Sequence, residues 1–179
     1  MTKTEIITLG AGCFWCIEAV FNRLEGVHTV RSGFSGGHVI NPSYREVCAE
    51  KTGHAEVVEI EFNPERIKIS DIFEIFWSIH DPTTMNRQGN DIGSHYRSAI
   101  FYHNEYQRNI AEEYKSTLNN SGVFKNPIVT EITKWINFFP AENYHKDYFE
   151  LNGTEPYCQF VVRPKIEKFE KKFSNKLRD

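Results

Sequence analysis

The stretch that decides the fold is TEIITLGAGCFWCIEAVFNRLEG, residues 4–26. Residues 4–9 are rich in β-branched side chains, which is typical of a strand, and a glycine turn follows them. Beyond Cys13, apolar side chains recur at helical spacing until Gly26, which can end the helix: Ile17, Val20, Phe21 and Leu24. The stretch therefore predicts a strand, a glycine turn and a helix, with Cys13 where the helix begins.

The rest of the chain predicts a defined order of strands and helices. Alternating or β-branched runs predict further strands at 28–34, 55–62, 97–103 and 128–135. Helical spacing predicts further helices at 72–80, 105–118, 141–151 and from 164 onwards. The order βαββαβ over residues 4–103 is the split βαβ pattern. It predicts an α+β two-layer sandwich with a mixed β-sheet, a ferredoxin-like core, extra helices and long loops.

Local signals predict where these helices begin. Ser70 or Asp71 can cap the second helix, and Asn104 with Gln107 three residues later forms a capping-box signal for the third. Prolines can open the last two helices, at Pro140 and Pro164. Residues 81–96 have no periodicity and several turn formers, so they predict a long loop, which in a compact domain is usually functional.

Composition limits the class of protein. With 179 residues, 40% of them hydrophobic, the chain is expected to form one domain over 1–179. The net charge of -3 creates no field that would attract nucleic acid or a membrane. No apolar run approaches the roughly 20 residues that span a bilayer, and the N-terminus lacks the pattern of a signal peptide. We therefore expect a cytoplasmic protein and, without an obvious apolar seam, a monomer.

Cys13 is the leading candidate for chemistry. The chain has four cysteines, too few for a disulfide scaffold, so each thiol needs its own interpretation. At a helix N-terminus the dipole and free N–H groups favour an anion, which predicts a lowered pKa for Cys13 and a nucleophilic thiolate. A small buried apolar residue is the alternative. Cys13 and Cys16 also form a CxxC pair, which leaves dithiol exchange open but lacks the two further ligands of a zinc site.

Other residues are candidates by their type and local position. Phe14 and Trp15 can form a pocket wall for a small apolar group, or belong to the core. Glu56 shares a strand face with apolar residues, so its carboxyl is either desolvated, with a raised pKa, or reaches water at the strand end. Asp91 and Tyr96 lie in the predicted long loop and can be site residues or solvated turn formers.

Two kinds of residue are harder to interpret from position alone. Tyr44 can donate a hydrogen bond to a substrate oxygen or be an ordinary half-buried aromatic. The histidines His54, His80 and His145 have no spacing that pairs them, so we interpret them as structural or surface residues.

The chain resembles peptide methionine sulfoxide reductases of the A class. The resemblance rests on long strings spread over nearly the whole chain: GCFWC, GFSGG, NPSYREVC, TGHAEVVEI, HDPTTMNRQGNDIGSHYRSAIFY and FFPAENYHKDY. It implies an oxidoreductase that reduces the S epimer of methionine sulfoxide, free or in proteins, and so repairs oxidative damage. It also implies no bound cofactor and no metal, with reducing equivalents supplied by thioredoxin.

The resemblance also implies roles for the candidate residues. Cys13 is the nucleophile, and Phe14 and Trp15 contact the methyl group of the substrate. The acid is Glu56, assisted by hydrogen bonds from Tyr44 and Tyr96, and Asp91 lies in the same site. Attack by the thiol releases methionine and leaves a sulfenic acid on Cys13, which a second thiol condenses to a disulfide.

The chain departs from the family pattern in two places. Cys16 stands where a glycine is common, and the glycine-rich cysteine tail of many members is replaced by the basic segment PKIEKFEKKF. Cys158, where that tail would start, is the expected resolving thiol, and Cys16 is its rival. His95 replaces a glutamine, and Cys48 is expected to be structural.

Overall fold

The centre of the protein is a six-stranded sheet in the order β7-β6-β1-β3-β2-β8. The structure is a computed structural model that describes residues 3–179. The strands are β1 Glu5–Ala11, β2 Val27–Ser35, β3 Ala55–Phe62, β6 Ser98–Tyr102, β7 Glu131–Lys134 and β8 Phe139–Pro140. The β6-β1-β3-β2 block is antiparallel throughout, whereas β7 runs parallel to β6. The predicted α+β fold with a mixed sheet and a split βαβ core is confirmed.

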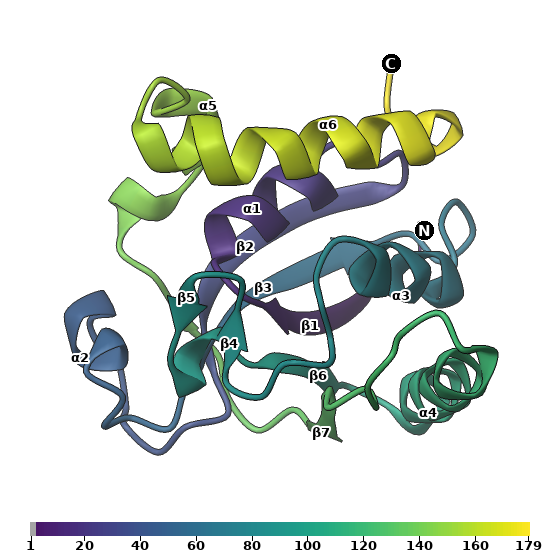
Figure 1. Cartoon of the computed structure of the whole chain (residues 1–179), viewed down its shortest axis with the longest axis horizontal. Coiled ribbons are helices and arrows are strands. Elements are labelled where there is room, and N and C mark those ends of the chain that lie inside the picture. The colour runs from purple at the N-terminus through teal and green to yellow at the C-terminus, as the bar shows by residue number, and fades with distance from the viewer. Residues whose placement is uncertain (1–2) are drawn as a thin grey trace.

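Helices cover one face of this sheet (Figure 1). They are α1 Phe14–Phe21, α2 Tyr44–Cys48, α3 Ile69–Ser78, α4 Glu105–Ser121, α5 Tyr148–Leu151 and α6 Arg163–Lys172. The last helix, α6, lies across α1. By contrast, α2 and the short hairpin of β4 Arg87–Gln88 and β5 Asp91–Ile92 lie at the end of the sheet where α1 begins (Figure 1).

The main hydrophobic core lies between the sheet and α1, α3 and α6. On β3 it uses every second residue, Val58, Ile60 and Phe62, which are fully buried. A smaller cluster that includes Val57 and Phe101 lies on the other face. Burial of a large apolar side chain contributes roughly 1.5–3 kcal/mol, so this alternation fixes the register of β3. The same register places the Glu56 side chain on the face of the sheet that carries the main core.

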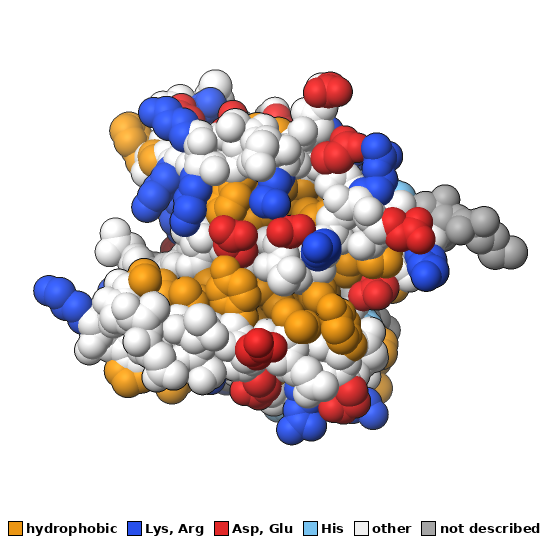
Figure 2. All heavy atoms as spheres, turned by 90° about the vertical axis from the view of Figure 1, so that its right-hand side faces the viewer, with side chains coloured by type: hydrophobic (Ala, Val, Ile, Leu, Met, Phe, Trp, Pro, Cys, Tyr) orange, Lys and Arg blue, Asp and Glu red, His pale blue; other side chains and the backbone are white. Residues whose placement is uncertain are grey.

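An apolar cleft opens between α3, α4 and α6, and Figure 2 shows its hydrophobic floor with charged side chains above it. Its lining includes Trp77, Tyr114 and Phe169, with Lys168 at the edge. Neither Cys13 nor Glu56 lines it. No helix within residues 3–179 combines the length and apolar character needed to cross a membrane.

The structure corrects the predicted start of α3. The N-cap is Lys68, and Asp71 lies three residues into the helix, where its carboxylate accepts the backbone N–H of Lys68 at 3.1 Å. The helix therefore begins before Ser70, because an acidic group in the first turn can satisfy the free N–H from inside the helix.

The predicted helix at 141–151 is wrong. The segment instead follows the end of β8 at Pro140, and it holds a 3-10 turn at Asn143–His145 and only one helical turn, α5. Asp147 adopts a left-handed conformation with φ of 53°, and its N–H donates to the buried Glu18 carboxylate at 2.8 Å. This tertiary hydrogen bond outcompetes a continuous helix.

The predicted loop at 81–96 is more ordered than its sequence indicates. It contains a hairpin of β4 Arg87–Gln88 and β5 Asp91–Ile92, followed by a 3-10 turn at Ser94–Tyr96. Gln88 holds the base of the hairpin, since its side chain bonds the backbone N–H and carbonyl of Asp81. Such side-chain bonds to backbone cannot be predicted from periodicity.

Asn104 is the N-cap of α4, as the sequence predicts. Asn104 Oδ1 accepts the N–H of Gln107 at 2.9 Å, while the Gln107 side chain accepts the N–H of His103 rather than that of Asn104. We expect Asn104→Ala to lower the free energy of unfolding by about 0.5–2 kcal/mol, measured by urea titration. The matched variant Asn104→Asp, which can still cap, should lose much less. Equal losses in both variants would contradict the capping role.

Candidate active site

Cys13 lies where β1 turns into α1. It is the N-cap of the helix, with φ of -63° and ψ of 125°, and it is 7% exposed. The preceding Gly12 has φ of +87°, and a Cβ at Gly12 would come within 2.8 Å of Gln88 Cγ. Only glycine accommodates both the left-handed backbone and the close neighbour. The turn therefore aims the thiol between α1 and the loop that carries Gln88.

The pKa of Cys13 is raised well above its usual value, which corrects the prediction of a lowered one. Burial is the main cause, and negative charge on Glu56 and on Cys16 adds to it. The backbone N–H of Trp15 and the hydroxyl of Tyr157 lower the pKa, but less strongly. The helix N-terminus acts in the predicted direction, yet desolvation of a fully buried thiol is the larger effect.

Glu56 lies directly beside this helix start. Its side chain is 0% exposed, and the N–H of Phe14 donates to Oε1 at 3.3 Å. Burial raises the pKa of Glu56 to about 8, the Phe14 N–H lowers it, and the charge of Asp91 raises it. Of the two interpretations of Glu56, the desolvated carboxyl on the apolar face is confirmed. At neutral pH the group is a proton donor.

Two tyrosines lie near the same carboxyl. Tyr44 begins α2 and Tyr96 ends the 3-10 turn after β5, and both are half-buried. Burial raises the pKa of each, followed by negative charge on Glu56. Both hydroxyls therefore stay protonated and can donate hydrogen bonds. The segment 81–96 thus places Tyr96 near Glu56.

Asp91 contacts Tyr157, a residue near Cys13 that the sequence analysis did not single out. Its Oδ2 accepts the Tyr157 hydroxyl at 2.6 Å, and Tyr157 is also among the groups that lower the pKa of Cys13. Tyr157 immediately precedes Cys158, so the C-terminal segment lies over the thiol. Nothing in the local sequence pattern distinguishes Tyr157, because its role depends on a contact between residues far apart in the chain.

Aromatic rings line the other side of Cys13. Phe14 is fully buried against Phe34, with ring centroids 5.7 Å apart. Trp15 stacks on Tyr148 with centroids 3.7 Å apart and planes 7° apart, and its Nε1 donates to His145 Nδ1 at 3.0 Å. His145 is therefore part of this aromatic cluster, which its sequence position did not reveal. The density of aromatics in FFPAENYHKDY was the one available signal.

The other two singled-out histidines are structural, as expected. His54 is 1% exposed, and its ring bonds the Gly37 N–H and the Val39 carbonyl. His80 is buried, and its ring bonds the Phe76 carbonyl and the Ser98 hydroxyl.

All four cysteines are free thiols. Cys16 is 5% exposed, and its N–H donates to the Cys13 carbonyl at 3.2 Å. Cys13 and Cys16 hold the N-cap and N3 positions, whose side chains face each other in a capping box. Burial raises the pKa of Cys16 to about 11, and negative charge on Cys158 is among the further causes. Cys16 thus lies close enough to Cys13 and to Cys158 for their charges to influence one another.

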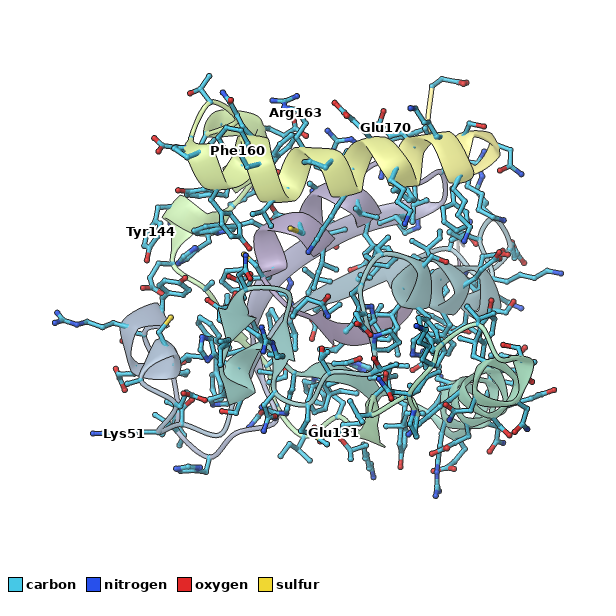
Figure 3. All side chains as sticks on the ribbon, viewed as in Figure 1. Lys51, Glu131, Tyr144, Phe160, Arg163 and Glu170 are labelled. Carbon is cyan, nitrogen blue, oxygen red and sulfur yellow. The ribbon has the colours of Figure 1, made fainter. Side chains whose placement is uncertain are left out.

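Cys158 is fully buried at the start of a π-helical turn, Cys158–Val162, that leads into α6. Phe160 in the same turn is 77% exposed, and Figure 3 shows Phe160 and Arg163 where this turn enters α6, above α1. One side of the turn therefore buries the thiol, and the other faces solvent.

One group within residues 3–179 has the composition of a metal-ligand set. Cys48, Glu56 and His95 each present a ligand atom, and these atoms lie within 4.8 Å of one another. The CxxC pair is not part of this group.

Comparisons with known proteins identify the family. Residues 5–177 match the family "Peptide methionine sulfoxide reductase". A protein named "Peptide methionine sulfoxide reductase MsrA" from Trichodesmium erythraeum is 50% identical, with 97% of this chain and 98% of the relative covered. A relative of the same name from Saccharolobus solfataricus is 51% identical, with 97% of each chain covered.

Solved structures agree with the sequence match. Reduced Mxr1 from Saccharomyces cerevisiae superimposes with a TM-score of 0.80 at 32% identity, covering 87% of this chain and 90% of the other. Methionine sulfoxide reductase A of Corynebacterium diphtheriae gives a TM-score of 0.76 at 34% identity, covering 87% and 78%. The predicted resemblance is confirmed. The chain belongs to the peptide methionine sulfoxide reductase family.

Proposed function

We propose that the protein is a peptide-methionine (S)-S-oxide reductase that reduces free and protein-bound methionine S-sulfoxide and so repairs oxidised proteins. It is an oxidoreductase that acts on a sulfur group with a disulfide as acceptor. One observation carries the proposal: the Cys13 thiol lies beside a buried carboxyl, Glu56, whose pKa of about 8 keeps it protonated at neutral pH. Membership of the family supports the same reaction.

The chemical step pairs a nucleophile with an acid. The Cys13 sulfur attacks the sulfoxide sulfur, and the sulfoxide oxygen, a poor leaving group, must accept a proton as its bond to sulfur breaks. The products are methionine and a Cys13 sulfenic acid. The methionine sulfur gains two electrons and the Cys13 sulfur loses two, so no further reductant enters this step.

The ionisation of Cys13 is coupled to that of Glu56. An ionised Glu56 raises the pKa of the thiol, so the thiol loses its proton most easily when Glu56 is neutral. Glu56 is already protonated at neutral pH, so the thiol proton leaves to solvent and the thiolate attacks beside a neutral acid. Glu56 then gives its own proton to the sulfoxide oxygen and recovers one from solvent.

Further residues would position the substrate. The Tyr44 and Tyr96 hydroxyls, which lie near Glu56, donate hydrogen bonds to the sulfoxide oxygen. Phe14 and Trp15 contact the methyl group, supported by the aromatic cluster that they form with Tyr148. Asp91 accepts the Tyr157 hydroxyl and so orients the ring of Tyr157 near Cys13.

Two thiols compete for the sulfenic acid of Cys13. Cys158 is the resolving thiol that we propose from the tail position, and its neighbour Tyr157 lies close enough to Cys13 to lower the pKa of that thiol. Cys16 is the rival, and its N3 position opposite the N-cap supports direct reaction with Cys13. Condensation forms the disulfide and releases water. Thioredoxin then reduces the disulfide by thiol–disulfide exchange, and the enzyme needs no bound cofactor.

Replacing the acid tests its role. We expect Glu56→Gln to slow the release of methionine in a single turnover by about 10²-fold or more, because the amide cannot protonate the oxygen. Quenched-flow measurement with excess methionine S-sulfoxide gives the rate. Circular dichroism of the variant controls for folding. Normal turnover in a folded variant would remove Glu56 from the mechanism.

The pH profile gives an independent test. The raised pKa means that Glu56 is protonated below pH 8 and loses its proton as the pH rises through about 8. We therefore expect the single-turnover rate at saturating substrate to fall through this range. Glu56→Gln should lack this alkaline fall. The same fall in the variant would assign the titration to another group.

Thiol counting identifies the resolving residue. Reduced protein without external reductant should release about one methionine per chain and lose two thiols. If Cys158 resolves the sulfenic acid, Cys158→Ser should still release methionine but lose fewer thiols, whereas Cys16→Ser behaves as wild type. The reverse pattern transfers the role to Cys16. Titration with a thiol reagent after the single turnover makes the measurement.

The same experiment tests a second candidate function. The N-cap and N3 placement of Cys13 and Cys16 also suits a dithiol exchange protein. That function predicts reduction of a protein disulfide that disappears in Cys16→Ser, and no release of methionine. Absence of methionine from the wild type would overturn the reductase proposal.

A further inference from the structure

A mixed sulfur, oxygen and nitrogen cluster lies next to the proposed acid. The ligand atoms of Cys48, Glu56 and His95 lie within 4.8 Å of one another. They come from the end of α2, the start of β3 and the turn after β5, so three separate segments converge there. The reductase mechanism uses Glu56 but gives no task to Cys48 or His95.

Two atoms of this cluster are unsatisfied. Within residues 3–179, Glu56 Oε2 and His95 Nδ1 are buried and have no hydrogen-bond partner. Glu56 is 0% exposed and His95 is 4% exposed, so solvent reaches neither side chain freely. A buried polar group without a partner is unfavourable by about 1–3 kcal/mol. Both atoms therefore retain lone pairs that a bound cation could use.

The donor set matches zinc. A cysteine thiolate, a histidine nitrogen and a carboxylate oxygen are the usual ligands of zinc, and three of them leave a fourth position open. A Cys48 thiolate with a Glu56 carboxylate supplies two negative charges, which neutralise a divalent cation. Burial lowers the pKa of His95, which keeps its ring neutral and able to ligate.

The distances allow such a site after a small adjustment. Zinc bonds of 2.0–2.3 Å in a tetrahedron place donor atoms roughly 3.3–3.8 Å apart. The observed limit of 4.8 Å therefore requires a contraction of about 1.5 Å at most. Cys48 can supply it, because its side chain is half-buried at the end of a five-residue helix.

Zinc also has a route of entry. Figure 3 places α2 at the edge of the molecule, with Tyr144 and Lys51 on either side of it. The half-buried Cys48 can thus take the ion from solvent and pass it to the two buried ligands.

We propose that Cys48, Glu56 and His95 bind a zinc ion, and that zinc bound there inhibits the reductase by occupying the carboxylate of Glu56. Binding replaces the protons of the Cys48 thiol and the Glu56 carboxyl, which are released to solvent, and no group is oxidised. The inhibition rests on the proposed function, but the binding does not. Free zinc would then switch off repair until the ion is removed.

Binding is measured on the reduced full chain with zinc alone, by competition against a chromophoric chelator. We expect His95→Gln to weaken zinc binding at least ~10-fold, since loss of an outer-shell partner alone costs 10–100-fold. The matched control His38→Gln, at an exposed histidine outside the cluster, should bind as wild type. Cobalt substitution should give a thiolate-to-metal absorption band that Cys48→Ser abolishes.

Inhibition is measured as methionine released in one turnover, without thiol reductants that would bind zinc. Zinc should stop wild type and His38→Gln, whereas His95→Gln should keep its metal-free rate at the same zinc concentration. Unchanged zinc affinity in both His95→Gln and Cys48→Ser would overturn the site and assign binding to the other thiols. Zinc binding that depends on His95 in a protein that releases no methionine would overturn the reductase proposal alone.

Discussion

The hydrogen bond from the Phe14 N–H to the Glu56 carboxyl is the interaction on which the site depends. It joins the first residue of α1 to the start of β3, and it is the single partner found for a carboxyl that is fully buried within residues 3–179. Strand register decides that Glu56 points to the helical layer, because Val58 and the following alternate residues must be buried there. The same register that builds the core therefore places an acid beside a thiol.

Burial outweighs the helix N-terminus in setting the chemistry. The end of a helix favours an anion by typically 0.3–1 kcal/mol at an exposed position, whereas full desolvation of an ionisable group can shift its pKa by several units. Cys13 and Glu56 experience both influences, and in each the raised pKa shows that burial is larger. Both groups therefore hold their protons at rest, and the thiol becomes a nucleophile only when it loses its own.

The C-terminal part of the chain closes the site from outside the sheet. Trp15 stacks on Tyr148, Asp91 accepts the hydroxyl of Tyr157, and Glu18 accepts the N–H of Asp147. Each contact joins residues more than 60 positions apart. Together they break the helix that local spacing predicted at 141–151 and place Cys158 in a buried turn beside the reactive end of α1.

The sequence by itself determined the α+β class, the βαββαβ order of the core, the place of Cys13 and the face of Glu56, because periodicity and turn residues act locally. Its family motifs also indicated the reaction. Only the tertiary structure decided the raised pKa of Cys13, the contacts of Tyr157 and His145, and the meeting of Cys48 with His95. These properties depend on desolvation and on contacts between distant segments, which no local pattern of residues encodes.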